Sequence, residues 1–156
     1  MLKHFPEAEI LFDGVIRAVA AGSSVAATGV WGSGAELLVA HLRQKFPSRP
    51  IFVLLPTVDA TEKTLDDLPF FLGCEPVHLI GFDAPPLYGD FTALETLGSR
   101  VRVATHLLER KPTVVVSALQ SSLQPMPSRA ALEAAYMRIR RGDFLPPEEL
   151  VKKLIN

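Results

Sequence analysis

Blocks of apolar residues recur along the chain, and their spacing changes between that of strands and that of helices. Ile51–Leu55 is an apolar run without polar alternation, which is typical of a parallel strand buried on both faces. Ser24–Val30 is uncharged and ends in glycine and valine, and we interpret it as an earlier buried strand. Three more strands are expected, over Val77–Ile80, Thr113–Ser117 and, at a sheet edge, Tyr136–Arg140.

Helical spacing of apolar residues, bounded by glycine and proline, separates these strands. Helices are expected over Glu7–Ala21, Ala35–Phe46, Asp59–Phe71, Ala93–Arg110 and Glu148–Ile155, with a helical turn over Ala130–Ala135 and a loop over Ser121–Pro127. Because strand and helix alternate, we predict an α/β protein of three layers, with a mainly parallel sheet flanked by helices. Ligands of such folds bind beyond the carboxyl ends of the strands. The loops that could form a site are therefore Gly29–Gly34, Pro56–Asp59, Gly81–Gly89 and Ser117–Gln124.

Length and composition fit a single domain with a sizeable core. The chain has 156 residues, 48% of them hydrophobic, and 16 basic against 17 acidic residues give a net charge of −1. That balance argues against autonomous nucleic-acid binding, which needs an excess of positive charge, and against binding to a membrane surface. Ala18–Ala35 is uncharged but too rich in glycine and serine for a transmembrane helix, and no signal peptide is recognisable. We therefore expect a cytoplasmic protein.

Metal and thiol chemistry have little support in the sequence. Cys74 is the single cysteine, which excludes a disulfide framework and a multi-cysteine zinc site, and we expect a buried structural thiol. The four histidines include no pair at the i, i+4 spacing of a helical metal site. Asp66 and Asp67 are interpreted as a solvated helix face. We expect neither a metal nor a cofactor.

The segment from Thr28 to Glu36 (Thr-Gly-Val-Trp-Gly-Ser-Gly-Ala-Glu) follows the spacing of the phosphate-binding P-loop, G-x-x-x-x-G-K-[ST]. Ala35 replaces the lysine that reaches the phosphates, and Glu36 replaces the hydroxyl that binds magnesium. No expected strand is followed by a good match to the magnesium-binding acid of P-loop hydrolases. We therefore predict a vestigial, inactive nucleotide-binding loop and no catalytic residues. Its residues are Gly29, Gly32, Ser33, Gly34, Ala35 and Glu36.

Two alternatives for the same loop stay open. Its glycines could simply form a tight turn between strand and helix, with Trp31 either packed on a neighbouring helix, which we expect, or exposed as an anchor. The segment also approaches the T-G-x-x-x-G-x-G loop of short-chain dehydrogenases, although it is one residue short and the paired Tyr-x-x-x-Lys is absent. The alternative function is thus a small-molecule enzyme that binds a dinucleotide or nucleotide at Gly29–Gly34.

Four segments, in order along the chain, resemble one known family. The degenerate loop Gly29–Glu36 is similar to the G-V-T-G-S-G-K-T loop of the excision-repair protein UvrB, with its working residues lost. The other segments are Phe52–Pro56 with Asp66–Phe71, Pro86–Tyr88 with Glu95–Arg100 and Leu107–Leu108, and Val114–Gln120 with Gly142–Leu145 and Glu148–Leu150. On these residues, the chain resembles the N-terminal UvrB-like module of bacterial transcription-repair coupling factors.

The resemblance implies a fold, a role and a set of partners. Residues 1–156 would form a single degenerate P-loop-like (UvrB-homology) domain, the first segment of a larger, truncated module. Full-length family members are ATP-dependent DNA translocases that release stalled RNA polymerase and recruit UvrA for nucleotide excision repair. ATP hydrolysis belongs to a separate motor domain, and UvrA contact mainly to an inserted domain that would follow this segment.

For this chain alone, the resemblance implies a structural and interaction domain without catalytic activity. Its direct partners would be the neighbouring domains of the full-length protein. UvrA would be reached through the downstream domain, and RNA polymerase and DNA only through the full-length protein. We expect apolar surface where the rest of the module docks.

Overall fold

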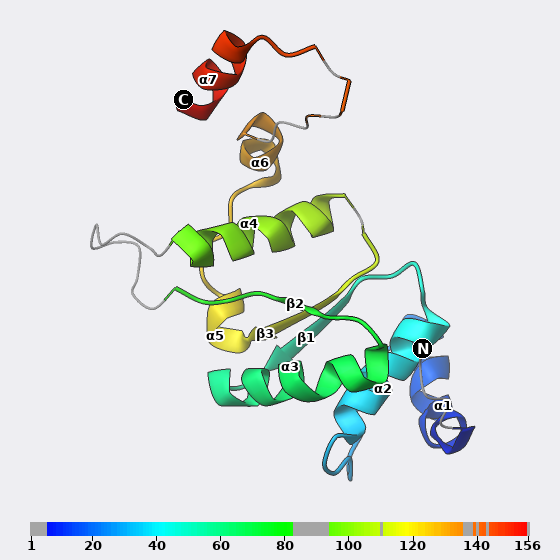
Figure 1. Cartoon of the computed structure of the whole chain (residues 1–156). Helices are drawn as coiled ribbons and strands as arrows, with labels where there is room; N and C mark the ends of the chain where they lie inside the picture. The colour runs from blue at the N-terminus through cyan, green and yellow to red at the C-terminus, as the bar shows by residue number, and fades with distance from the viewer. Residues whose placement is uncertain are drawn as a thin grey trace.

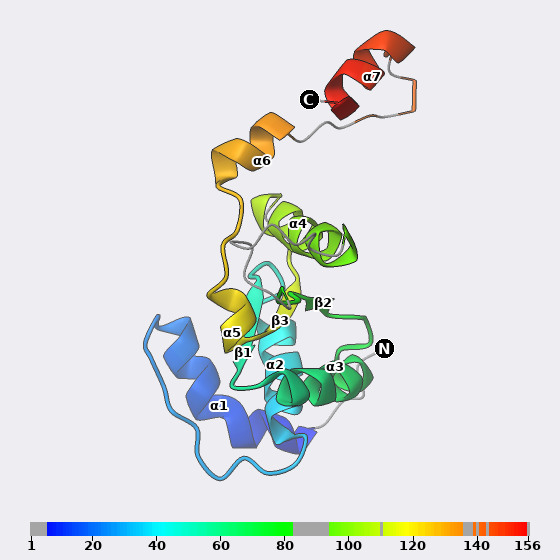
Figure 2. The same cartoon turned by 90° about the vertical axis from the view of Figure 1, so that its left-hand side faces the viewer.

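A computed structural model describes residues 6–82, 94–109, 111–135, 139, 141–142 and 144–155 of the chain. These residues form an α/β structure, with a small open parallel sheet and helices around it (Figure 1, Figure 2). The strands are β1 (Ile51–Leu55), β2 (Val77–His78) and β3 (Val114–Ala118). The helices are α1 (Pro6–Ala20), α2 (Gly34–Lys45), α3 (Val58–Leu72), α4 (Leu94–Leu108), α5 (Leu119–Ser122), α6 (Arg129–Ala135) and α7 (Pro147–Ile155).

The three strands are parallel and lie in the order β1-β3-β2, so β3 is the central strand. Ile51 of β1 pairs with Val114 of β3, and Val77 of β2 pairs with Val115. Every residue of β3 is buried, because the strand has a neighbour on each side and helices on each face. Its β-branched run of three valines suits this position, since such side chains pack well on a pleated surface.

Helices cover both faces of the sheet, and the side chains of β3 alternate between two apolar clusters. The cluster under α2 and α3 contains Ala40, Leu68, Leu72, Val114 and Val116. The cluster under α4 contains Leu79, Val103 and Val115. In Figure 1, α4 lies above the sheet, while α2 and α3 lie below it. The prediction of an α/β chain with a parallel sheet between helices is thus confirmed.

Local sequence fixes both ends of α3. Thr57 caps its N-terminus, where Thr57 Oγ1 accepts a hydrogen bond from the Ala60 N–H at 3.2 Å. Gly73 ends the helix with a φ of 70°, in the left-handed region, and its N–H donates to Pro69 O at 2.9 Å. These caps hold the first turn of α3 beside the carboxyl end of β1, which α3 follows after two residues.

The expected strand over Ser24–Val30 is wrong. Residues 23–31 have no regular secondary structure, and every residue from 21 to 32 is exposed. Small residues dominate the segment, with Val25 and Val30 as its larger apolar side chains, so burying it would remove little apolar surface from water. The glycine loop is therefore not preceded by a strand.

The expectation that β1 is buried on both faces is also wrong. Ile51, Val53 and Leu55 face the cluster under α2 and α3. Phe52 and Leu54 point to the opposite face and are 43% and 51% exposed. They are exposed because β1 is an edge strand and α4 packs against β2 and β3 instead.

The other expected helices are confirmed to within two residues at each end. β2 is shorter than the expected strand over Val77–Ile80, and the loop expected from Ser121 begins inside the short helix α5. The edge strand over Tyr136–Arg140 and the loop over Gly81–Gly89 lie outside the described residues, apart from residues 139, 81 and 82. Cys74 is exposed, so the expected buried thiol is wrong. No helix within the described part of the chain is both long enough and apolar enough to cross a membrane.

Candidate functional site

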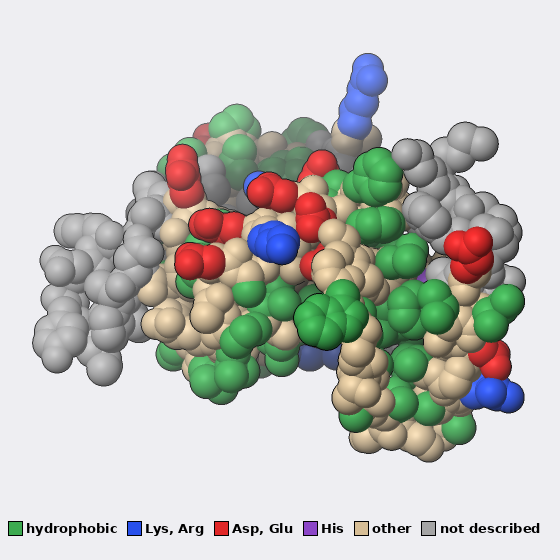
Figure 3. Space-filling model, turned by 90° about the horizontal axis from the view of Figure 1, so that it is seen from below, with side chains coloured by type: hydrophobic (Ala, Val, Ile, Leu, Met, Phe, Trp, Pro, Cys, Tyr) green, Lys and Arg blue, Asp and Glu red, His purple; other side chains and the backbone are tan. Residues whose placement is uncertain are grey.

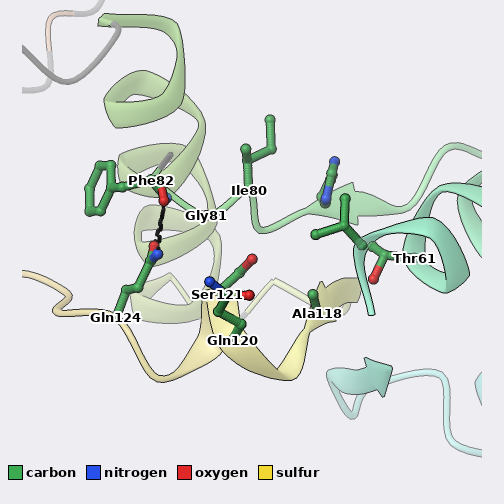
Figure 4. A pocket seen from close by; sticks show the side chains of 10 residues that line it. Thr61, Ile80, Gly81, Phe82, Ala118, Gln120, Ser121 and Gln124 are labelled. Atoms are coloured by element: carbon green, nitrogen blue, oxygen red, sulfur yellow. Dashed lines mark hydrogen bonds between the residues drawn. The ribbon is translucent and has the colours of Figure 1, made fainter. Parts of the chain in front are cut away.

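A pocket of about 240 Å³ lies at the carboxyl edge of the sheet, which we name the switch-point pocket (Figure 4). The first turn of α3 contributes Val58 and Thr61 to its wall, and the segment after β2 contributes Ile80, Gly81 and Phe82. The end of β3 and the α5 region close the remaining side. Because α3 and α4 leave the sheet on opposite faces, the pocket opens between diverging connections, which is where α/β sheets bind ligands.

The polar side chains that line the pocket, as far as the described residues show, carry no formal charge at neutral pH. Burial lowers the pKa of the His78 imidazole, an effect that the Glu62 carboxylate partly opposes, so His78 is neutral at pH 7. The Thr61 hydroxyl is fully buried and donates to Thr57 O at 2.8 Å, so it shapes the wall. Gln120 adds an exposed amide at the rim. The pocket therefore presents neutral hydrogen-bonding groups beside apolar walls.

Arg100 of α4 joins two of these walls from behind, and its side chain is only 1% exposed. Nη1 donates to Ile80 O at 2.7 Å and to Ser121 O at 3.2 Å. Nη2 donates to Gln124 O at 3.2 Å and to Pro125 O at 3.1 Å. Burial lowers the pKa of the guanidinium, but an arginine stays protonated at neutral pH. The dipoles of these backbone carbonyls stabilise the buried charge, and no ion pair of Arg100 is found among the described residues.

Gln124 fixes the same wall from the side of α5. Its Nε2 donates to Phe82 O at 3.0 Å, and its Oε1 accepts from the Phe82 N–H at 2.6 Å (Figure 4). The Phe82 ring lies under the Arg100 guanidinium, with 4.6 Å between the guanidinium carbon and the ring centroid. A Cβ at Gly81 would lie 2.6 Å from Ser121 Oγ and 3.2 Å from Ser121 Cβ, so any other residue would require Ser121 to shift. The wall is therefore built before any ligand arrives.

The glycine loop lies away from this pocket, and none of residues 29–36 lines it. Gly29 and Gly32 have φ values of 72° and 58°, in the region that favours glycine, and Gly34 begins α2. Ala35 is exposed in the first turn of that helix. Trp31 is 87% exposed, so the expected packing on a neighbouring helix is wrong and the exposed arrangement is the observed one.

Two side-chain hydrogen bonds attach the start of α2 to the middle of α3. Ser33 is the N-cap residue of α2, but its hydroxyl makes no cap bond and instead donates to Asp67 Oδ2 at 3.0 Å. Glu36 is 8% exposed, and its Oε1 accepts from Thr64 Oγ1 at 2.8 Å. Asp67 is thus half-buried and bonded rather than part of a solvated face, unlike the exposed Asp66. In this structure the glycine loop serves as a contact between two helices.

Sequence reasoning identified three of the four loops that could form a site, since Pro56–Asp59, Gly81–Gly89 and Ser117–Gln124 all contribute to the pocket. It did not single out Arg100 as a part of that site. The available signal was its position: Arg100 lies three residues after Leu97 and three before Val103, on the apolar side of α4. A cation on a buried helix face needs a partner of its own.

Comparison of the chain with protein-family models, with curated proteins and with solved structures finds no match in any of the three. The resemblance to transcription-repair coupling factors therefore stays a prediction from the sequence. Among the described residues, no group of three or more His, Cys, Asp or Glu side chains could hold a metal ion. The site has to be interpreted from its own chemistry.

Replacing Arg100 by Met should lower the free energy of unfolding by about 3 kcal/mol or more, because several buried carbonyls lose charged donors at once. Urea denaturation followed by circular dichroism measures this. Arg102→Met is the matched control on the same helix, since Arg102 is exposed, and its effect should stay within about 0.5 kcal/mol. Equal effects of the two substitutions would show that the hydrogen bonds of Arg100 contribute nothing beyond α4 itself.

The titration of His78 should be visible in NMR spectra as a midpoint below the ordinary histidine value of 6.5. The unfolded chain then takes up this proton first as the pH falls. Above pH 6.5, the ordinary pKa of histidine, neutral His78 costs the folded state nothing. As the pH falls from 6.5 towards the lower pKa of the folded state, the unfolded state gains the proton and stability is lost. Between pH 7 and pH 5, wild type should lose more stability than His78→Gln. A midpoint at or above the ordinary value would refute this assignment.

Proposed function

We propose that this chain is a non-catalytic, cytoplasmic α/β domain of P-loop-like, three-layer type that acts as a structural and interaction platform in a transcription-coupled DNA-repair protein. The observation that supports it best is the position of Glu36. Its carboxylate occupies the place of a magnesium-binding hydroxyl, yet it is buried and bonded to Thr64 of α3. A loop that is used in this way contributes to packing rather than to phosphate chemistry.

The charges around the loop oppose a nucleotide. A helix N-terminus attracts phosphate through its free N–H groups, but here the Glu36 and Asp67 carboxylates lie at that terminus. Ala35 offers no cation where a P-loop carries its lysine. These carboxylates would repel a phosphate bound there, and no side chain of the loop supplies a positive charge. Both requirements of a working P-loop, a cation and a metal ligand, are therefore unmet.

The open edge of the sheet supports the role of a platform. β1 has a paired neighbour on one side among the described strands, and an unpaired strand edge is a template for pairing with another strand. Phe52 and Leu54 add exposed apolar surface on this strand. We infer that a neighbouring domain of the same protein covers this edge.

The surface charge favours partners other than DNA. Seen from the side of α2 and α3, acidic side chains gather over part of the face (Figure 3). Exposed acids of α3 contribute to the surface, namely Asp59, Glu62 and Asp66. Such a face repels a phosphate backbone, so DNA and RNA polymerase would be reached only through the full-length protein, and UvrA through its downstream domain.

Isothermal titration calorimetry with MgATP tests the proposal. Wild type should show no binding tighter than about 1 mM and no ATP turnover, because the loop has lost its cation and its metal ligand. The dinucleotide alternative is tested by thermal denaturation with NAD and NADP. Neither should raise the melting temperature by more than about 2 °C.

The control for both measurements is Gly32→Val, which strains the loop at a positive φ without touching the core. Micromolar MgATP affinity or turnover that this variant abolishes would contradict the non-catalytic assignment. A dose-dependent rise in melting temperature with NAD or NADP, lost in the same variant, would favour the dinucleotide-binding enzyme instead.

A further inference from the structure

We propose that the switch-point pocket binds a small, uncharged molecule that combines an apolar body with a hydrogen-bonding edge. This site is separate from the glycine loop, on which the proposed function depends. Either proposal can fail without the other. Four observations carry the inference: the place of the pocket in the sheet, its rigid wall, the absence of lining charge and its size.

The place of the pocket is the first observation. β1 leads into α3 on one face of the sheet, whereas β2 leads into α4 on the other. The central strand β3 ends between them, at Ala118, which lines the pocket. Because the connections to α3 and α4 leave towards opposite faces of the sheet, a concave space remains between them. This is the general ligand position in open α/β sheets.

The wall is the second observation. Arg100 draws the carbonyls of Ile80, Ser121 and the Gln124 segment together, and Gln124 pairs with both backbone groups of Phe82. Charge-assisted hydrogen bonds to several carbonyls at once hold these segments in one arrangement. Binding to a preformed site loses no free energy to the ordering of loops.

Charge and size define the ligand class. Of the described side chains that line the pocket, none is acidic or basic at pH 7, because His78 is held neutral by burial. A charged ligand would give up hydration there and gain no ion pair in return. The imidazole of His78 and the amide of Gln120 can bond to a neutral polar edge, while Val58 and Ile80 contact an apolar body. A volume of about 240 Å³ is below that of drug-sized pockets, at roughly 300–1,000 Å³.

Three probes of nearly equal shape and different charge test this class: benzamide, benzoate and benzamidine. Each is titrated into the whole, ¹⁵N-labelled chain and followed by two-dimensional NMR. Benzamide should give saturable shifts at Thr61, Gly81 and Ser121, with a Kd of about 1 mM, within the affinity that so few atoms allow. Benzoate and benzamidine should bind at least about 10-fold more weakly, since each must bury an unpaired charge.

Gln120→Trp should lower the affinity for benzamide about 10-fold or more, because a large side chain at the exposed rim fills the entrance. Gln44→Trp, a matched change at an exposed position of α2, should leave that affinity unchanged. Val58→Trp repeats the obstruction from the α3 side, should Gln120→Trp disturb the fold. The proposal is overturned if benzamide causes no saturable shifts, if its shifts map elsewhere, or if neither rim variant weakens them. Equal binding of all three probes would overturn the uncharged class.

Discussion

The guanidinium of Arg100 is the interaction on which the carboxyl edge of the sheet depends. A cation that is almost fully buried must recover the hydrogen bonds and the charge balance that water gave it. Backbone carbonyls on both sides of the switch-point pocket accept from its two terminal nitrogens, whereas Nε has no partner among the described residues. These carbonyls come from segments on either side of α4 in the chain. Without the guanidinium these carbonyls would face one another with no donor between them. The shape of the pocket therefore follows from one side chain of a helix that does not line it.

The glycine loop and the carboxyl edge of the sheet, the two regions where the sequence suggested a ligand site, have different roles in the fold. At the glycine loop, Ser33 donates a hydrogen bond to Asp67, and Glu36 accepts one from Thr64. These bonds hold the start of α2 against α3. At the carboxyl edge, His78 and Gln120 stay available beside apolar walls. The glycine loop thus serves as a contact between two helices, while the general ligand position of the α/β sheet stays open.

Local patterns predicted the elements whose signals are local. The valine run of β3, the polar and apolar spacing of α3 and the prolines between elements were sufficient to predict these elements and to select three loops of the pocket, but not the strand order. The strand over Ser24–Val30 was predicted wrongly because a strand needs a neighbouring strand to pair with, and an uncharged sequence does not show whether one is there. The bonds from Ser33 to Asp67 and from Glu36 to Thr64 join residues 34 and 28 positions apart, and no periodicity encodes such pairs. The burial of Arg100 likewise depends on carbonyls that only the folded chain assembles.

Native-state hydrogen exchange at Phe82 tests the central claim, that Arg100 holds the pocket wall in place. The Phe82 N–H donates to Gln124 Oε1. The internal reference is the Ile51 N–H, which donates to Thr113 O at the opposite end of the strands from the pocket. In wild type, we predict that the Phe82 amide is protected to a degree similar to Ile51. In Arg100→Lys, the protection of Phe82 should fall by about 100-fold relative to Ile51, because a lysine cannot bridge the carbonyls as a guanidinium does. A Phe82 amide that exchanges freely in wild type, or that keeps its relative protection in Arg100→Lys, would contradict the account.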